Sequence, residues 1–246
     1  MPEKISRAKE LIAGAKKILV FTGAGVSTGS GIPDYRGPGG VWLKREPVLY
    51  RDFLASTRAK LDYWKYKADT FPAFRAAVPN AAHKAVVALE RAGRLLALVT
   101  QNIDSLHRAA GTHTDKLIEL HGSGLYAECL DCLNWISMEE ALEKFRADGA
   151  PPLCSCGGWL KPAVVMFGEP LVPESLVKAF KAAEDCDLVL SAGSSLAVEP
   201  AASVPLSAKA GGKPYIIVNL GATAHDKAAD IKLDGDACEI LPDLLS

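Results

Sequence analysis

The chain has 246 residues, which is enough for one medium domain, or for one domain that carries a small inserted one. Apolar residues make up 49% of it and charged residues 23%, as in ordinary globular proteins. The net charge of −1 gives no electrostatic reason to bind nucleic acid or a membrane surface, so we expect neither as a direct partner.

No segment predicts a membrane span or a secretion signal. The longest apolar runs, such as "AVVMF" and "DLVLSAG", are far too short to cross a bilayer. The N-terminal stretch "MPEKISRAKELIAGAKK" predicts a helix over 5–17 and lacks the uninterrupted apolar core of a signal peptide. We therefore expect a cytoplasmic protein, and we expect it to be a monomer.

Strands and helices alternate along the chain. Short apolar runs predict strands at 18–21, 95–102, 116–122, 187–196 and 214–221, and the apolar pattern resumes at 163–169. Helices are predicted at 58–76, 81–92, 137–149 and 175–185, and an ordered loop with short helical pieces at 34–56. This alternation predicts an α/β fold with a parallel, doubly wound sheet.

Polar residues and glycines follow the predicted strands. In doubly wound sheets, ligands bind in a crevice at the carboxyl ends of the strands. The residues at those ends should therefore converge on one site; they are Gly23, Gln101, Asn102, His121, Gly193, Ser194 and Asn219.

A glycine-rich turn follows the first predicted strand. The sequence Gly23-Ala24-Gly25 would let a pyrophosphate approach backbone N–H groups at a helix start. However, Gly29 comes one residue late for the G-x-G-x-x-G fingerprint, and no acidic residue ends a second strand about 20 positions further on. This departure argues against a dehydrogenase. A tight turn that only packs the strand against a helix is the alternative interpretation.

Four of the six cysteines form two close pairs, "CLDC" and "CSC", with 21 residues between them. Four thiolates suit tetrahedral zinc and leave no open coordination position, so a bound zinc would be structural. Two unlinked thiol pairs are the alternative. The predicted ligands are Cys129, Cys132, Cys154 and Cys156. The remaining two, Cys186 and Cys238, are interpreted as buried small residues.

His121 is the candidate general base. It follows a strand and precedes a glycine, and histidine transfers protons near neutral pH. A histidine with a purely structural role is the alternative, and the other four histidines are interpreted in that way. In "TQNID", Gln101, Asn102 and Asp104 could orient an amide or ribose hydroxyls, or could form a capped polar loop.

Seven stretches together resemble the sirtuin family, the NAD-dependent protein-lysine deacylases. They are "TGAGVSTGSGIPDYRGPGGVW", "TQNIDSLHRAAG", "ELHGS", "CLDC" with "CSC", "VVMFGE", "GSSLAVEPAA" and "IVNLG". They occur in the family's order, from about residue 20 to residue 240, which is nearly the whole chain.

The resemblance implies a Rossmann-like NAD-binding domain over 1–123 and 164–246, a small zinc-binding domain over 124–163, and a cofactor-binding loop over 34–56. It implies contacts to NAD from Gly23, Ala24, Gly25, Thr28, Asp34, Tyr35, Arg36, Trp42, Gln101, Asn102, Ile103, Asp104, Gly193, Ser194, Ser195, Asn219, Leu220, Asp236 and Ala237. The zinc ligands would be the four paired cysteines.

The resemblance also implies the protein substrate and the reaction. An acylated lysine of a protein or peptide would bind between the domains, beside Val165, Phe167, Gly168 and Val198. Asn102 and Asp104 would orient a water and the nicotinamide amide while the acyl oxygen attacks the ribose and forms an imidate. His121 would act as general base on a ribose hydroxyl. The products would be free lysine, nicotinamide and O-acyl-ADP-ribose.

One departure from the family pattern bears on which acyl group the protein would remove. Desuccinylating sirtuins carry a Tyr-x-x-Arg pair after the cofactor loop, whereas Trp64 and Lys67 of "DYWKYKAD" stand at these positions. A lysine cannot form the bidentate contact of an arginine, which favours acetyl-lysine or a longer neutral acyl chain. A protein mono-ADP-ribosyltransferase and a non-catalytic sensor of NAD and peptide are the alternative functions.

Overall fold

The computed structural model describes residues 2–35, 40–41 and 46–246. Two residues predicted to bind the cofactor, Arg36 and Trp42, lie outside the described residues, as does most of the middle of the predicted cofactor-binding loop. The following description concerns the remaining chain.

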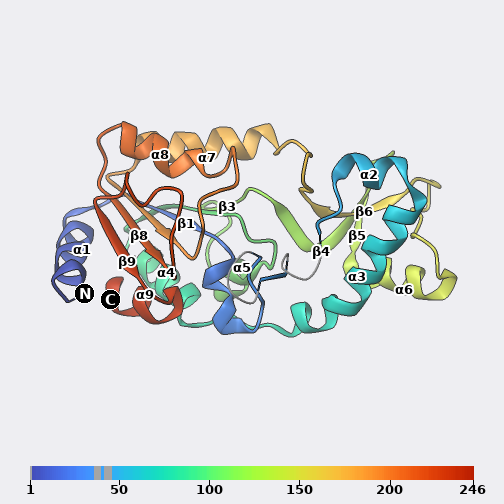
Figure 1. Cartoon of the computed structure of the whole chain (residues 1–246), viewed down its shortest axis with the longest axis horizontal. Helices are drawn as coiled ribbons and strands as arrows, with labels where there is room; N and C mark the ends of the chain where they lie inside the picture. The colour runs from blue at the N-terminus through green and yellow to red at the C-terminus, as the bar shows by residue number, and fades with distance from the viewer. Residues whose placement is uncertain (1, 36–39, 42–45) are drawn as a thin grey trace.

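Six parallel strands form the larger sheet, in the order β3-β2-β1-β7-β8-β9 (Figure 1). The strands are β1 Ile18–Thr22, β2 Leu95–Thr100, β3 Leu117–Glu119, β7 Leu188–Ala192, β8 Tyr215–Asn219 and β9 Ile231–Asp234. Counted within this sheet, the order is the 3-2-1-4-5-6 of a Rossmann fold, with the switch point between β1 and β7. The predicted doubly wound parallel sheet is confirmed.

Helices cover both faces of this sheet, and β1 shows why. Its side chains alternate in direction, so Ile18 and Val20 belong to one apolar cluster, while Leu19 and Phe21 belong to another on the opposite face. The first cluster includes side chains of α1 Pro2–Gly14, α4 Ala81–Arg91 and α9 Ala237–Leu244. The second includes side chains of α7 Pro173–Asp185 and α8 Ser203–Ala210. Continuous apolar strands are therefore buried on both sides.

A second, antiparallel sheet has the order β5-β4-β6, with β4 Gly122–Cys129, β5 Trp135–Ser137 and β6 Leu160–Val164. It packs with α6 Met138–Asp148. The apolar run at 163–169 was expected to resume the pattern of the larger sheet. Instead, its first two residues end β6 of the smaller sheet, and the rest follow that strand. The separate sheet with its four clustered cysteines matches the expected small inserted module.

Helix α3, Thr57–Ala76, also packs on the smaller sheet, although it is distant in the sequence (Figure 1). Its Trp64 and Phe71 share an apolar cluster with Met138, Leu142 and Leu160. The Trp64 indole donates a hydrogen bond to the Leu160 carbonyl. The short helix α2, Tyr50–Ala55, precedes α3. The smaller part of the molecule is thus built from two separate segments of the chain.

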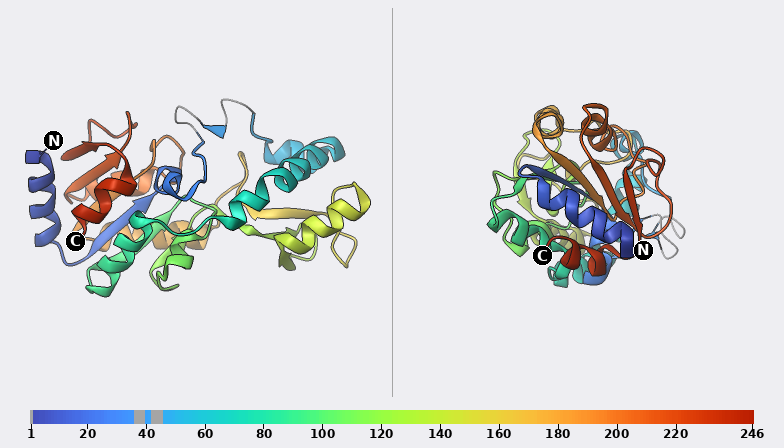
Figure 2. Two further views of the ribbon diagram at one scale, coloured as in Figure 1. Left: turned by 90° about the horizontal axis from the view of Figure 1, so that it is seen from below. Right: turned by 90° about the vertical axis from the view of Figure 1, so that its left-hand side faces the viewer.

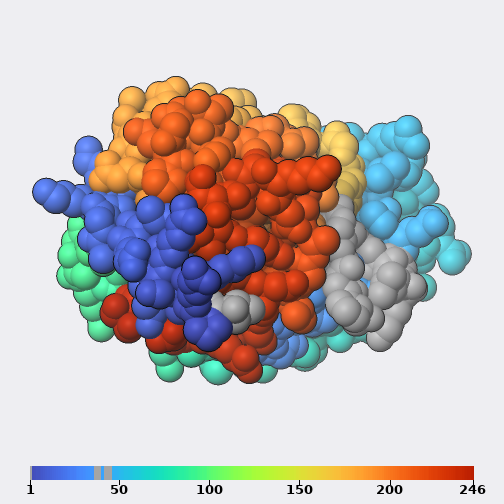
Figure 3. All heavy atoms as spheres, turned by 60° about the vertical axis from the view of Figure 1, so that its left-hand side comes forward, coloured from blue at the N-terminus to red at the C-terminus, as the bar shows by residue number. Residues whose placement is uncertain are grey.

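Figure 2 shows these two parts side by side, with the larger sheet and the chain termini at one end and the smaller sheet at the other. The N-terminal helix lies against C-terminal elements, as the blue and red atoms of Figure 3 show. Within the described ranges, no helix combines the length and apolar character that a membrane span requires.

Several short elements had no prediction from the sequence. They are α5 Leu106–Ala110, α8, β9, α9, β4 and β5, together with two 3₁₀ turns, Ala24–Val26 and Thr28–Ser30. Each of them contains eight residues or fewer, and so few residues carry little periodic signal.

We predict that Leu98→Ala lowers the free energy of unfolding by about 2–5 kcal/mol, because Leu98 is fully buried in β2 and its truncation leaves a cavity. The matched control Leu54→Ala, on an exposed side chain, should change it by less than about 0.5 kcal/mol. Urea unfolding followed by circular dichroism measures both. Equal losses in the two variants would contradict this account of the core.

Candidate active site

A cavity of about 860 Å³ runs from the carboxyl edge of the larger sheet to α3 and β6. Its lining brings together most of the described residues that the sequence singled out. From the cofactor set these are Gly23, Ala24, Gly25, Thr28, Asp34, Tyr35, Gln101, Asn102, Ile103, Gly193, Ser194, Ser195, Asn219, Leu220, Asp236 and Ala237. The lining also contains His121, Val165, Phe167, Gly168 and Val198.

Asp104 is the described member of the set that does not line this cavity. It faces a small adjoining pocket of about 10 Å³, which it shares with Ala24, Tyr35 and Asn102. Its carboxylate accepts hydrogen bonds from the Ser27 hydroxyl, at 2.7 Å, and from the Leu106 N–H, at 2.8 Å. Burial raises the pKa of Asp104, and these hydrogen bonds oppose the shift. Asp104 thus lies behind the surface that a ligand would touch.

The glycine loop lies directly on the turn after β7. The Gly25 N–H donates to the Gly193 carbonyl at 2.8 Å. A Cβ on Gly25 would come within 2.7 Å of Gly193 Cα, and one on Gly23 within 2.8 Å of the Gly193 carbonyl oxygen. Two backbones therefore meet here with no side chain between them, which leaves peptide groups at the cavity wall.

Gly29 has a different role from the first two glycines. A Cβ there would lie 2.9 Å from the Sγ of Cys238, on helix α9. Gly29, which does not fit the spacing of the G-x-G-x-x-G fingerprint, thus permits close packing of the loop against a helix. Cys238 is half-buried in this contact, so its interpretation as a buried residue was wrong, whereas Cys186 is fully buried as predicted.

Asn102 ties the β2 loop to the glycine loop. Its amide nitrogen donates to the Gly23 carbonyl and to the Ser27 hydroxyl, both at 3.1 Å. Its own N–H donates to the Thr100 hydroxyl at 3.0 Å. Gln101 connects the β2 loop to the turn after β7, because its amide nitrogen donates to the Ser194 hydroxyl at 2.8 Å. Three strand ends are thereby fixed relative to one another.

His121 has a defined proton arrangement. Its Nδ1 lies 2.9 Å from the Gln101 carbonyl oxygen, which can only accept, so Nδ1 carries the proton. Nε2 then holds the lone pair that a general base needs. Burial lowers the pKa of His121, and the bond to Gln101 partly opposes this shift. Of the five histidines, all of which the structure describes, His121 is the one that lines the cavity.

The segment after β6 borders the cavity next to His121. The Val165 N–H donates to the His121 carbonyl at 3.0 Å. Two residues further on, the Phe167 carbonyl accepts from the Tyr50 N–H at 2.9 Å, and Phe167 forms a parallel bridge with Leu49. The segment that was predicted to bind substrate is therefore held between His121, after β3, and the start of α2.

At the opposite end of the cavity, Asn219 and Asp236 have structural partners. The Asn219 amide donates to the carbonyls of Leu220 and Gly221. The Asp236 carboxylate accepts from the Cys238 N–H and caps α9. Leu220 is 71% exposed and stands at the rim.

Sequence reasoning missed several residues of this site. Ser27 joins Asn102 to Asp104, and α3 contributes Tyr63 and Tyr66 to the cavity beside Lys67, which the sequence had singled out. Trp64, which was aligned with a substrate-binding position, is fully buried in the core of the smaller part and does not line the cavity. The helical spacing of Tyr63, Tyr66 and Lys67 was the available signal, because positions three and four apart share a face.

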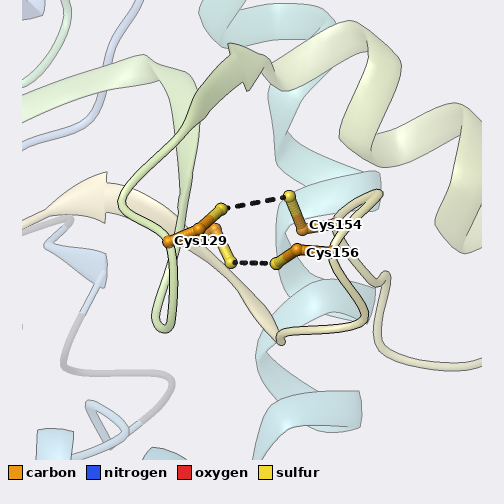
Figure 4. Close-up of side chains that lie close together, drawn as sticks. Cys129, Cys154 and Cys156 are labelled. Atoms are coloured by element: carbon orange, nitrogen blue, oxygen red, sulfur yellow. Dashed lines mark hydrogen bonds between the residues drawn. The ribbon is translucent and has the colours of Figure 1, made fainter.

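The four paired cysteines form a cluster suited to a metal ion. All four sulfur atoms lie within 4.8 Å of one another. The Sγ of Cys129 is 3.5 Å from that of Cys156, and the Sγ of Cys132 is 3.7 Å from that of Cys154. In Figure 4 the thiols from the β4 turn and from the "CSC" turn face one another. None of the six cysteines, all described, forms a disulfide.

Comparisons with known proteins agree on one family. The sequence model that describes the Sir2 family matches residues 23–200 of this chain. The chain is 41% identical to the "NAD-dependent protein deacetylase" of Thermodesulfovibrio yellowstonii, over 99% of this chain and 94% of that protein. It is 40% identical to the "NAD-dependent protein deacylase 2" of Archaeoglobus fulgidus, over 100% of this chain and 96% of that protein.

Solved structures lead to the same result. A Sir2 enzyme with 41% identity superposes with a TM-score of 0.88, covering 100% of this chain and 97% of that one. A Sir2 complex with a p53 peptide and NAD⁺, 33% identical, gives 0.89 over 98% of this chain and 97% of that one. A further complex with deacetylated p53 peptide and 3'-O-acetyl-ADP-ribose, 34% identical, gives 0.90 over 96% and 95%. The chain belongs to the Sir2 family.

Proposed function

We propose that the protein is an NAD-dependent protein-lysine deacylase. The observation that carries this proposal is the single cavity in which a neutral, oriented His121 meets the glycine loop and the Asn102 network. Relatives that match nearly the full chain are named deacetylases or deacylases, and related structures hold peptide, NAD⁺ and an acetylated ADP-ribose. The products would be free lysine, nicotinamide and O-acyl-ADP-ribose.

The described residues fit NAD as co-substrate. The bare backbone at Gly23, Gly25 and Gly193 is the kind of wall that a pyrophosphate approaches closely. Asn219, Leu220 and Asp236 at the far end would hold the adenosine half. Asp34 and Tyr35 would lie against the nicotinamide ribose, and burial raises the pKa of the Tyr35 phenol, which keeps it neutral.

Each catalytic residue has a task that its contacts support. His121 Nε2 would accept a proton from a ribose hydroxyl, since Nδ1 is already committed to Gln101. Asn102 would orient the nicotinamide end of the site. Asp104, behind the cavity wall, would act through Ser27, which it shares with Asn102. Val165, Phe167, Gly168 and Val198 would receive the peptide backbone as an added strand, which demands little of the peptide sequence.

The cysteine cluster fits a structural zinc. Tetrahedral zinc with Zn–S bonds of about 2.3 Å sets its sulfurs about 3.8 Å apart. The Sγ–Sγ distances between the two turns, 3.5 and 3.7 Å, are close to this value. We propose that this ion holds a small domain over 124–163, and that the Rossmann-like domain spans 1–123 and 164–246, with α3 as the element that completes the small core.

We predict that His121→Ala lowers deacylation by about 10²–10⁴-fold, because it removes the general base. Purified protein, NAD and acyl-lysine peptides, with products read by mass spectrometry, provide the test. His113→Ala, on a largely exposed side chain, is the matched control and should keep full activity. ADP-ribose that remains on protein, in place of O-acyl-ADP-ribose, would favour the transferase. Bound NAD without either product would favour a sensor.

We predict an acidic limb in the pH–rate profile with its midpoint below pH 6.5. Burial lowers the pKa of His121 from its ordinary value of about 6.5, and only the neutral imidazole can accept a proton. The rate should therefore reach half of its plateau value only below pH 6.5. Initial rates with an acetyl-lysine peptide between pH 5 and 8 measure this. A midpoint above 6.5 would contradict the assignment.

We predict about one zinc per chain in the purified protein, and loss of that zinc in Cys154→Ser, which removes one of four thiolates. Elemental analysis measures the stoichiometry. Cys186→Ser, at a buried cysteine outside the cluster, is the control and should retain the zinc. Well-folded protein without metal would rule out the zinc proposal.

A further inference from the structure

Lys161, on strand β6, is a buried lysine whose ammonium is surrounded by oxygen partners. Its side chain is 2% exposed. Nζ donates to the carbonyls of Pro162, at 3.1 Å, and Val164, at 2.9 Å. It also forms ion pairs with Glu128 at 3.0 Å and with Glu169 at 3.2 Å. Partners of this kind offset the cost of burying a charge.

Glu169 closes the segment that follows β6 into a turn. Its N–H donates to the Met166 carbonyl at 3.0 Å, and its carboxylate accepts from the Met166 N–H at 2.9 Å. Gly168, inside this turn, has a φ of +83°, as the third residue of a type II turn requires. The same carboxylate pairs with Lys161. One buried ammonium thus holds both ends of the segment 164–169.

Segment 164–169 lines the cavity, whereas Lys161 lies behind it. All six residues of the segment belong to the cavity wall, and Lys161, in the described chain, does not. Within the described residues, the Val165 carbonyl and the Gly168 N–H make no backbone hydrogen bond. Backbone groups of this kind are what an added peptide strand pairs with. Lys161 can therefore affect a bound peptide only through the position of the segment.

The two carboxylates that pair with Lys161 connect it to different parts of the structure. Glu128 lies directly opposite Lys161 on the neighbouring strand β4, so this ion pair stays within the smaller sheet. Glu169, in contrast, belongs to the cavity wall. The start of α2 also joins the segment, because the Tyr50 N–H donates to the Phe167 carbonyl at 2.9 Å while the Tyr50 ring lies 5.9 Å from the Lys161 ammonium.

We propose that Lys161 and Glu169 are positioning residues that preform segment 164–169 as the edge on which the peptide backbone binds. This inference rests on the proposed deacylase function and adds to it. Because a preformed edge needs less ordering when the peptide arrives, the pair should set the affinity for extended peptides. It should have little effect on NAD, whose proposed phosphate contacts follow strands of the larger sheet.

The experiment compares an extended acetyl-lysine peptide with a single acetyl-lysine whose two ends are blocked. Only the peptide continues as a strand beyond the acetylated residue. In Glu169→Ala we expect the KM for the peptide to rise about 10–100-fold, as for the loss of a hydrogen bond to a charged group. The kcat at saturating peptide, the KM for NAD and the kcat/KM for the blocked lysine should each change by less than about threefold.

Glu128→Ala is the matched control, because it removes the other ion pair of Lys161 and leaves the one to the segment. It should keep the peptide KM within about threefold of the native value. Glu169→Gln should lose less affinity than Glu169→Ala, since its amide oxygen can still accept from the Met166 N–H. Equal rises in KM for peptide, blocked lysine and NAD, or equal effects of Glu128→Ala and Glu169→Ala, would overturn the inference and leave the deacylase function standing.

A double-mutant cycle shows whether Glu169 acts together with Lys161 or touches the peptide by itself. If the two act as one unit, Lys161→Met combined with Glu169→Ala has the same peptide KM as Glu169→Ala alone. Additive effects would assign Glu169 a direct contact and overturn the positioning role. Lys161→Met leaves two carboxylates without their cation, which destabilises the fold. If this variant does not fold, the comparison of Glu169→Ala with Glu128→Ala still decides the inference.

Peptide binding separates this inference from the deacylase function. Fluorescence anisotropy with a labelled acetyl-lysine peptide, in the presence of a non-reactive NAD analogue, measures affinity without turnover. Weaker binding by Glu169→Ala than by the native protein, with no peptide deacylated by the native protein, would sustain the inference and refute the deacylase function. Equal binding by the two proteins, or binding by neither, refutes the inference whatever the turnover.

Discussion

The contact between the glycine loop and the turn after β7 is the constraint on which the site depends. Gly25 and Gly193 meet backbone to backbone, and no side chain larger than hydrogen fits between them. Because both loops follow neighbouring strands of the larger sheet, their peptide groups face the same cavity. Gly193 also has a φ of +61°, a conformation that costs glycine little and other residues much.

The side-chain network builds on this contact. Asn102 and Gln101 follow β2 and reach to either side, one to the glycine loop and the other to Ser194. The Gln101 carbonyl in turn fixes the His121 ring. The tautomer of the proposed general base is therefore set by the same loop that holds the proposed nicotinamide site. A shift of one loop would disturb proton transfer and co-substrate binding together.

The smaller part of the molecule contributes a different kind of surface. Its core is apolar and includes Trp64 and Phe145, which stack at 6.4 Å between ring centroids. On the cavity side of the same helix stand Tyr63, Tyr66 and Lys67. One face of α3 thus packs in the core of the smaller part, and the other face lines the cavity. The larger sheet and α3 thus line different parts of one cavity.

The sequence by itself determined the doubly wound sheet, the strand ends that form the site and the paired cysteines, because strand periodicity, glycine turns and Cys-x-x-Cys spacing are local signals. Tertiary structure alone decided the rest. Trp64 and Lys67 differ in role only because α3 turns one toward the small core and the other toward the cavity. Likewise, Ser27 gains its partners, and Gly29 its tight contact, only when distant segments meet. Such contacts depend on the direction of side chains in the folded chain, which no local pattern records.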